Sequence, residues 1–280
     1  MFDTVRAELF KLRKRPAAWV LLAAAAVLSQ VFGYLIPYLS YTTGDADSFG
    51  GGAPRDLLAG TLPDQLLINT IGGFPVFAGA LALVLGALMF GGEYGWGTVK
   101  TMLTARPGRT SVLAGQLLAL GAALAVGVAV LSLLSAATST GIALAEDQPL
   151  RWPGAVELAA GLGAGWLVLL MWASLGAVLG VTLRSVALPI GLGVVWVLGI
   201  ENLVSAMAGS VLTALQPVRD MLPGVNAGSL VAAVVPDQVT EPPPVLTTTV
   251  AEPRALATLV CYVVVCAAVA AWTARRRDVV

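Results

Sequence analysis

The residues able to do chemistry are few in this sequence of 280 residues. The chain contains no histidine, which is the commonest general base and the commonest metal ligand in proteins. Its two cysteines, Cys261 and Cys266, lie in one apolar run, a setting that suits neither a disulfide framework nor a zinc site. An intramembrane enzyme would need paired acids or a nucleophile beside a base, and the apolar stretches show neither. The sequence therefore predicts no catalytic residue and no metal site.

A partial match to a phosphate-binding loop lies at Gly92 and Gly97, which have the spacing of the first two glycines in GxxxxGK[ST]. Thr98 and Val99 follow these glycines, in place of the lysine and hydroxyl residue that hold nucleotide phosphates and Mg²⁺. We therefore expect that the chain does not hydrolyse ATP, is not an enzyme and needs no cofactor of its own.

One acid, Glu201, falls inside an apolar stretch, which makes it a candidate functional residue. Counting about 1.5 Å per residue from Val186 places it about 22 Å along a hydrocarbon core of about 30 Å. At that depth its side chain can reach water, so we favour an interfacial position over a proton or substrate site. Asn202 beside it can hydrogen-bond the break into the following loop.

The elements that must position these residues are transmembrane helices. Hydrophobic residues make up 58% of the chain and charged residues only 11%, against about 25% charged in soluble domains. A helix needs about 20 apolar residues to cross a bilayer. We predict an all-α polytopic membrane protein, with residues 1–280 forming one transmembrane domain. The six predicted spans are 17–39, 71–91, 112–138, 155–183, 186–204 and 255–274.

The basic residues predict the orientation, because lysine and arginine favour the cytoplasmic side of short loops. The formal net charge is zero, which offers no overall attraction for nucleic acid, but the two signs are separated along the chain. With both termini in the cytoplasm, twelve basic residues fall inside and four outside, while ten acids lie in external loops. The inner basic set is Arg6, Lys11, Arg13, Lys14, Arg15, Lys100, Arg106, Arg109, Arg184, Arg275, Arg276 and Arg277, the outer basic set is Arg55, Arg151, Arg219 and Arg254, and the acids are Asp45, Asp47, Asp56, Asp64, Glu146, Asp147, Asp220, Asp237, Glu241 and Glu252.

Two segments outside the spans show further patterns. Residues 1–16 place Phe2, Val5, Leu9 and Leu12 at helical spacing among basic residues, which predicts an amphipathic helix at the inner interface; a simple topological anchor is a compatible alternative. We expect that helix to break at Pro16. The outer loop 205–254 and its margin hold two apolar stretches, 203–215 and 227–235, separated by the Pro223-Gly224 turn. Each is too short to span, so we predict re-entrant or interfacial helices.

Small residues line several predicted spans. Gly72, Gly79 and Gly86 recur in the second span, and the fourth contains GxxxG twice, at Gly161/Gly165 and Gly176/Gly180. Small faces let helices approach closely in lipid, either within one chain or across a dimer. We favour packing within the chain, because glycine is generally frequent in membrane spans.

The cytoplasmic segment 92–111 is longer than a simple turn requires. Thr98 can cap a short helix over Val99–Ala105, which Pro107-Gly108 would stop. Such a helix can transmit a push between two spans. On geometry alone, an ordinary connecting loop with a positive flank is the favoured interpretation.

A family resemblance favours the short helix over the ordinary connecting loop. The opening RAELFKLRKRPAAW resembles the basic interfacial helix that begins type-2 permease subunits of ATP-binding-cassette (ABC) exporters. The segment after the second span also resembles the family pattern, although Gln116 stands where relatives often carry a lysine. In that family the segment contains the coupling helix that docks onto the ATPase. The matching residues, which the resemblance makes ATPase-coupling candidates, are Glu93, Gly97, Thr98, Lys100, Leu103, Pro107 and Arg109.

The resemblance implies a permease subunit of an ABC exporter in a bacterial plasma membrane. Its expected partners are a separate ABC ATPase, which would use the ATP, and a second permease, either an identical copy or a homologue. Two other functions remain open at the level of sequence. One is a secondary transporter driven by an ion gradient, for which Glu201 would be the exchange site, and the other is a non-transporting, ATPase-linked membrane scaffold or sensor.

Overall fold

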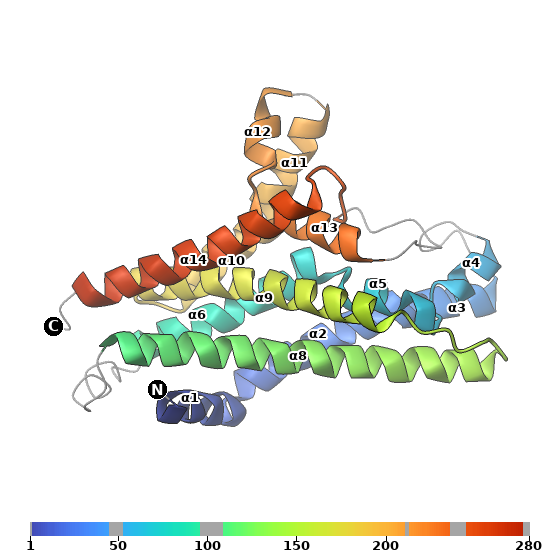
Figure 1. The fold of residues 1–280 in the computed structure, drawn as a ribbon, viewed down its shortest axis with the longest axis horizontal. Helices are drawn as coiled ribbons and strands as arrows, with labels where there is room; N and C mark the ends of the chain where they lie inside the picture. Colours follow the sequence, from blue (N-terminus) through green and yellow to red (C-terminus); the bar gives the residue numbers. More distant parts are fainter. Residues whose placement is uncertain (1, 45–52, 96–108, 211–212, 236–244, 277–280) are drawn as a thin grey trace.

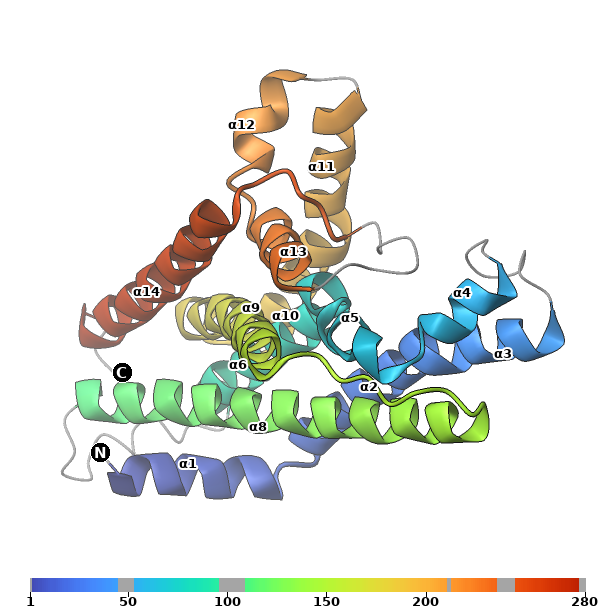
Figure 2. The same cartoon turned by 45° about the vertical axis from the view of Figure 1, so that its right-hand side comes forward.

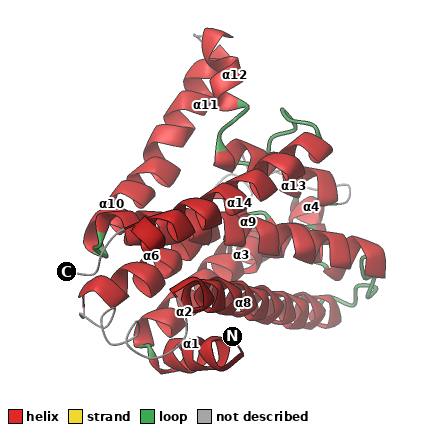
Figure 3. Cartoon of the chain, turned by 60° about the vertical axis from the view of Figure 1, so that its left-hand side comes forward, coloured by secondary structure: helices red, strands yellow, loops and turns green. Residues whose placement is uncertain are grey.

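The computed structural model describes residues 2–44, 53–95, 109–210, 213–235 and 245–276, and every regular element within these ranges is helical (Figure 3). Six helices are long and apolar enough to cross a membrane, which confirms the predicted number of spans. Their limits differ at several ends, and the second helix begins at Pro63 rather than Ile71. The spanning helices are Pro16–Thr43, Pro63–Gly92, Val112–Ala145, Ala155–Leu183, Ala187–Ala208 and Glu252–Thr273.

The first helix, α1 (Phe2–Lys14), lies beside the N-terminal part of α8 (Arg109–Ala145; Figure 2). Arg15 is extended and Pro16 opens α2, because proline is tolerated only in the first turn of a helix; the predicted break is confirmed. The apolar face of α1 is buried in part. Leu12 is buried and Val5 packs against the core, whereas the side chain of Leu9 is 37% exposed. Glu8 is also buried, in an ion pair with Lys11 at 2.8 Å.

Three of the spans are interrupted by π-helical turns, which carry an extra residue and are frequent at functional sites. The first span consists of α2 (Pro16–Gln30), η1 (Val31–Leu35) and α3 (Ile36–Thr43), and α4 (Pro54–Ala59) follows it. The second consists of η2 (Pro63–Gln65), α5 (Leu66–Ile71), η3 (Phe74–Ala78) and α6 (Gly79–Gly95). The fifth consists of α10 (Ala187–Val195), η4 (Trp196–Ile200) and α11 (Glu201–Ser210).

The third and fourth spans are continuous helices. α8 has 37 residues, and at a rise of about 1.5 Å per residue it is about 55 Å long, well beyond a hydrocarbon core of about 30 Å. α9 (Ala155–Leu183) ends at Arg184, which takes the left-handed conformation with φ of 49° and turns the chain directly into the fifth span. The two residues that the predicted spans 155–183 and 186–204 leave between them therefore form a tight turn.

Glycines bring α6 and α9 into backbone contact along their length. A Cβ at Gly86 would overlap the carbonyl oxygen of Ala173, and one at Gly176 would overlap that of Leu83. Further along, Gly180 faces Gly91 across the same seam. Any larger side chain at these positions would push the helices apart. The prediction that the small residues pack within the chain is therefore confirmed for this pair of helices.

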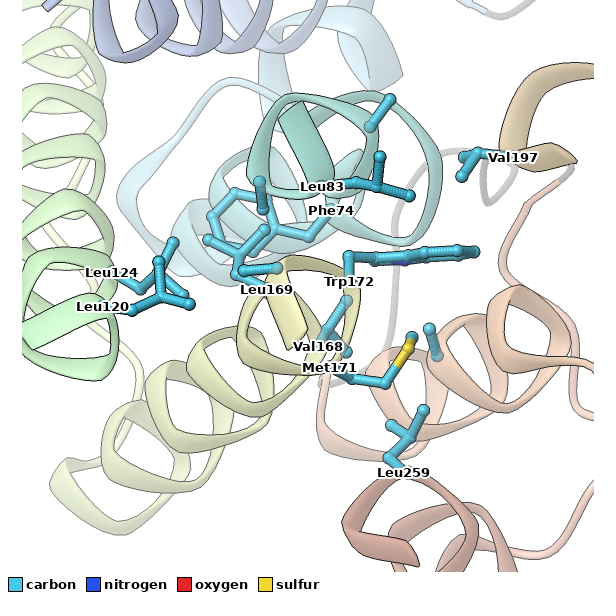
Figure 4. Packing of buried hydrophobic residues seen from close by; sticks show 14 of the residues in the cluster. Phe74, Leu83, Leu120, Leu124, Val168, Leu169, Met171, Trp172, Val197 and Leu259 are labelled. Atoms are coloured by element: carbon cyan, nitrogen blue, oxygen red, sulfur yellow. The ribbon is translucent and has the colours of Figure 1, made fainter. Parts of the chain in front are cut away.

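The buried core surrounds α9 (Figure 4). Trp172 of α9 is fully buried and its Nε1–H donates to the carbonyl oxygen of Pro75 at 3.0 Å. In the π turn the N–H of Gly79 donates to the carbonyl oxygens of Phe74 and Val76, so the indole supplies a donor for that of Pro75. Leu120 and Leu124 approach the core from α8, and Leu259 approaches it from the last span.

The end of the fifth span and the chain that follows it project from the bundle, and the chain then returns to it. The C-terminal part of α11, η5 (Thr213–Leu215) and α12 (Gln216–Arg219) stand away from the other helices (Figure 1). α13 (Pro223–Val234) packs against α9, η3 and α14 (Glu252–Arg276), and most of its residues are buried. The expected turn at Pro223-Gly224 is wrong, because these residues form the first turn of α13.

Candidate functional site

The coupling residues expected from the sequence are placed only in part. The backbone of Glu93 lies in the last turns of α6, and that of Arg109 begins α8. Both helix ends lie at the end of the molecule where the two termini are found (Figure 1). The remaining five candidates, Gly97, Thr98, Lys100, Leu103 and Pro107, fall outside the described residues, so their role stays a prediction.

Other elements of the described chain meet at this same end. The guanidinium of Arg15 donates to the carbonyl oxygen of Leu88 in α6 at 3.3 Å. Gly91 packs closely on the backbone of Ser185 in the turn between α9 and α10. The residue before the first span and the turn between the fourth and fifth spans therefore each contact the end of the second span.

The second candidate, Glu201, is positioned by the fifth span and by α13. Its side chain is only 4% exposed, so the expectation that it reaches water is wrong. The carboxylate turns inward because the backbone N–H of Gly224 donates to its Oε1 atom. This N–H belongs to the first turn of α13, where backbone donors lack intrahelical partners and a negative charge is favoured by the helix dipole. Glu201 therefore caps α13 from another helix.

Gly224 is the residue that permits this contact. A Cβ at this position would lie 2.8 Å from Oε1 of Glu201, so a larger residue would displace the carboxylate. Next to it, Asn226 donates from Nδ2 to the carbonyl oxygens of Asp220 and Leu222, at 3.0 and 2.8 Å. These bonds hold the chain that leads into α13 in one conformation.

A cavity of about 130 Å³ lies beside this carboxylate. Two π-helical turns contribute to its wall, with Pro75 from η3 and Val197 from η4. Polar side chains complete it, and Oε2 of Glu201 is buried with no hydrogen-bond partner in the described part of the chain. The polar lining residues are Glu201, Asn202, Ser205, Arg219, Thr247 and Thr249.

The chemistry of this cavity is that of a structural polar site. Arg219 is engaged with Asp220 at 2.8 Å. Asn202 donates to the carbonyl oxygens of Val197 and Leu198 in the preceding π turn. The expected break into the following loop is absent at this point, because α11 continues to Ser210. Within the described ranges, no three acids or cysteines approach closely enough to hold a metal ion. The site therefore fastens helices together and offers no general acid-base pair.

Sequence reasoning missed a second carboxylate that fastens helices. Glu146, just after α8, accepts hydrogen bonds from Tyr38 at 2.8 Å and from Tyr41 at 3.0 Å. The two tyrosines lie about one helical turn apart in α3, so both hydroxyl groups can point to one partner. That spacing is visible in the sequence, but nothing in the sequence identifies Glu146 as the acceptor.

Six apolar helices of spanning length, packed around a glycine seam and a small polar cavity, define a multi-pass membrane protein. The chain belongs to a family of ABC transporters, because the family model described as "ABC-2 family transporter protein" matches residues 5–279. A search of curated proteins gives no match. Family membership makes this chain a membrane-embedded permease of an ABC transporter, which confirms the resemblance found in the sequence.

Proposed function

We propose that this chain is the permease subunit of an ATP-driven exporter in the bacterial plasma membrane, with both termini in the cytoplasm. The observation that carries the proposal is the match of nearly the whole chain, residues 5–279, to the ABC-2 transporter family. The distribution of charge supports the orientation. α1 and the C-terminal end of α9, which carry Lys11 and lead into Arg184, lie at the end of the bundle that also holds the termini. The C-terminal end of α8, directly before Glu146, lies at the opposite end.

In this proposal a separate ABC ATPase binds the segment 93–109 and supplies the energy. Closure of the ATPase pair on ATP would push the segment, which joins α6 of the packed core to the long helix α8. The contacts of Arg15 with Leu88 and of Gly91 with Ser185 support this interpretation, because they tie neighbouring elements to the end of α6. A movement of the segment would therefore reach several spans together.

A second permease, identical or homologous, completes the proposed pathway. Only 6% of the residues in the apolar stretch of the first span, and 22% of those of the fifth and of the sixth, are buried inside the chain. The second and fourth spans have 61% and 56% of theirs buried. The first, fifth and sixth spans thus offer the largest unpacked apolar surfaces for lipid or for another subunit.

The decisive experiment first looks for an ABC ATPase among the neighbouring genes and then measures its coupling to this chain. The two proteins are co-expressed, purified together and reconstituted into vesicles, and ATP hydrolysis and ATP-dependent transport are measured. We expect Glu93→Gln and Arg109→Ala to lower transport at least about 10-fold, which corresponds to about 1.4 kcal/mol of coupling. Arg151→Ala, an exposed arginine at the opposite end of the bundle, is the control and should leave both activities unchanged. Full transport and full complex yield in both test variants would contradict the proposal.

A further inference from the structure

A narrow apolar groove runs between the N-terminal helix and the bundle. Its volume is about 250 Å³, and residues of α1, α2, α6, α8, α9 and the end of η3 line it. Small side chains such as Ala25, Ala123 and Gly127 leave the space open, and leucines such as Leu12 and Leu85 form its walls. Figure 2 shows α1 and the start of α2 beside α8, where the groove lies.

The mouth of the groove has a different chemistry from its walls. Arg13 is the single charged residue among the described side chains that line it, and Arg13 is exposed. Trp19 also lines the groove, is 57% exposed and donates from Nε1 to the carbonyl oxygen of Arg13 at 2.9 Å. Tryptophan and arginine at the end of an apolar helix are typical of the headgroup level of a bilayer.

We propose that this groove binds one acyl chain of an anionic phospholipid, with the headgroup phosphate held at Arg13. The walls of an apolar groove offer water no hydrogen-bond partners, whereas a lipid tail fills the groove with apolar contacts. A single positive charge at the mouth of an apolar groove matches a molecule with one anionic headgroup and an apolar tail. Glu8, the nearby acid, is buried and paired with Lys11, so its charge is already compensated.

The charge of α1 strengthens the preference for an anionic headgroup. Basic residues close its last turn, and a basic surface helix attracts anionic lipids of the adjoining leaflet. The guanidinium also offers paired N–H donors that fit phosphate oxygens. The inference needs only that the chain lies in a bilayer with α1 at its surface, so it stands apart from the proposed coupling to an ATPase.

The test compares phosphatidylglycerol with phosphatidylcholine, each added to the purified full-length chain in detergent. We expect phosphatidylglycerol to raise the Tm by about 3 °C and phosphatidylcholine to raise it by less than about 1 °C. Arg13→Gln should remove this difference between the lipids. Arg6→Gln, an exposed arginine on the same helix outside the groove, should keep it.

A second pair of variants tests the groove itself. Gly127→Leu fills it, and there is room for a side chain to begin there, because a Cβ at this position would lie 3.9 Å from its nearest neighbour, in Leu22. We expect this variant to lose the response to both lipids. Gly141→Leu, on the same helix with open space around it, should respond as the unmodified chain does.

A fluorescence measurement keeps the proposal testable even if Gly127→Leu fails to fold. Phosphatidylglycerol brominated on its acyl chains should quench Trp19, and the quenching should be smaller in Trp19→Phe and in Arg13→Gln. The proposal is overturned if Gly127→Leu keeps the full shift, if Arg13→Gln and Arg6→Gln behave alike, or if Trp19→Phe is quenched as strongly as the unmodified chain. Transport is not measured, so failure here leaves the proposed function untouched.

Discussion

The second and fourth spans are held in the molecule very differently from the first and fifth. The second and fourth meet through glycines at the α6–α9 seam, with Trp172 filling the core beside them. The first and fifth spans bury less of their apolar stretches, and each is held in part by a carboxylate, Glu146 for the first and Glu201 for the fifth. Gly193 of the fifth span also packs against Leu83 of α6. The second and fourth spans are therefore joined by close backbone packing, whereas the first and fifth depend more on polar contacts with the rest of the molecule.

This difference teaches which parts of the molecule can move separately. A seam of backbone contacts has no alternative arrangement of similar packing, because every glycine must lie opposite its partner. A hydrogen bond to a carboxylate can break and re-form without changing the core. We therefore expect α6 and α9 to move as one body, and the first and fifth spans to change position against it.

The largest effect should come from breaking the central seam. Gly176→Leu would drive a side chain into the carbonyl oxygen of Leu83, and we expect a loss of stability of about 3 kcal/mol or more. Thermal unfolding and the yield of monodisperse protein in detergent measure this loss. The matched control is Gly163→Leu on the same helix, where a Cβ meets nothing within 4 Å and the change should stay within about 0.5 kcal/mol. Equal Tm values for the two variants would show that the seam is not the rigid part.

A smaller effect should follow from releasing the fifth span. Glu201→Ala leaves the N–H of Gly224 without its acceptor, and we expect a loss of about 2 kcal/mol in thermal unfolding. Glu201→Gln keeps an oxygen acceptor and should lose less. ATP-dependent transport should persist in Glu201→Gln. If the unmodified chain transports without ATP and the Glu201→Gln variant does not transport at all, an ion-gradient transporter would be favoured instead.

The contact of the first span with Glu146, just after α8, should contribute less to stability than the contact of Glu201 does. Tyr38→Phe and Glu146→Gln each remove part of a contact that lies near the surface, where water competes for the same groups. We expect each variant to lower the Tm by about 2 °C, and the double variant to lower it by less than the sum, because both changes remove one interaction. If the Tm changes of the two single variants add up fully in the double variant, the two residues do not interact as described.

The smallest effect is expected on the exposed face of the first span. Val27 is 60% exposed, so Val27→Ala should change the stability of the single chain by less than about 0.5 kcal/mol. The same variant should lower the dimer fraction measured by chemical crosslinking in membranes if this face meets a second permease. A large fall in Tm for the single chain would show that the first span is packed more tightly than its exposure indicates.

Much of this architecture can be predicted from the sequence, because it depends on local composition. Six apolar stretches, the break at Pro16 and the small faces of the second and fourth spans all follow from residue type and spacing. Gly86 and Gly176 indicate that two helices approach closely, although their partners Ala173 and Leu83 are found only in the structure.

The contacts of the two carboxylates cannot be predicted in the same way. Glu201 meets Gly224 after the chain has projected through α12 and returned, and depth in the bilayer alone indicated contact with water. The π turn before Glu201 adds a residue to the helix and so changes the direction of every side chain that follows. Hydrophobic periodicity does not report such a turn, which is why the orientation of this residue was missed.

The length of α8 has a consequence for how the two surfaces of the membrane communicate. The helix begins beside the contact of Gly115 with Thr4 and ends just before Glu146, with no π turn among its 37 residues. A tilt of about 5° about one end of a helix about 55 Å long displaces the other end by about 5 Å. That displacement exceeds the range of a hydrogen bond. A tilt of this size on one side of the bilayer would therefore be enough to release Tyr38 and Tyr41 from Glu146 on the other.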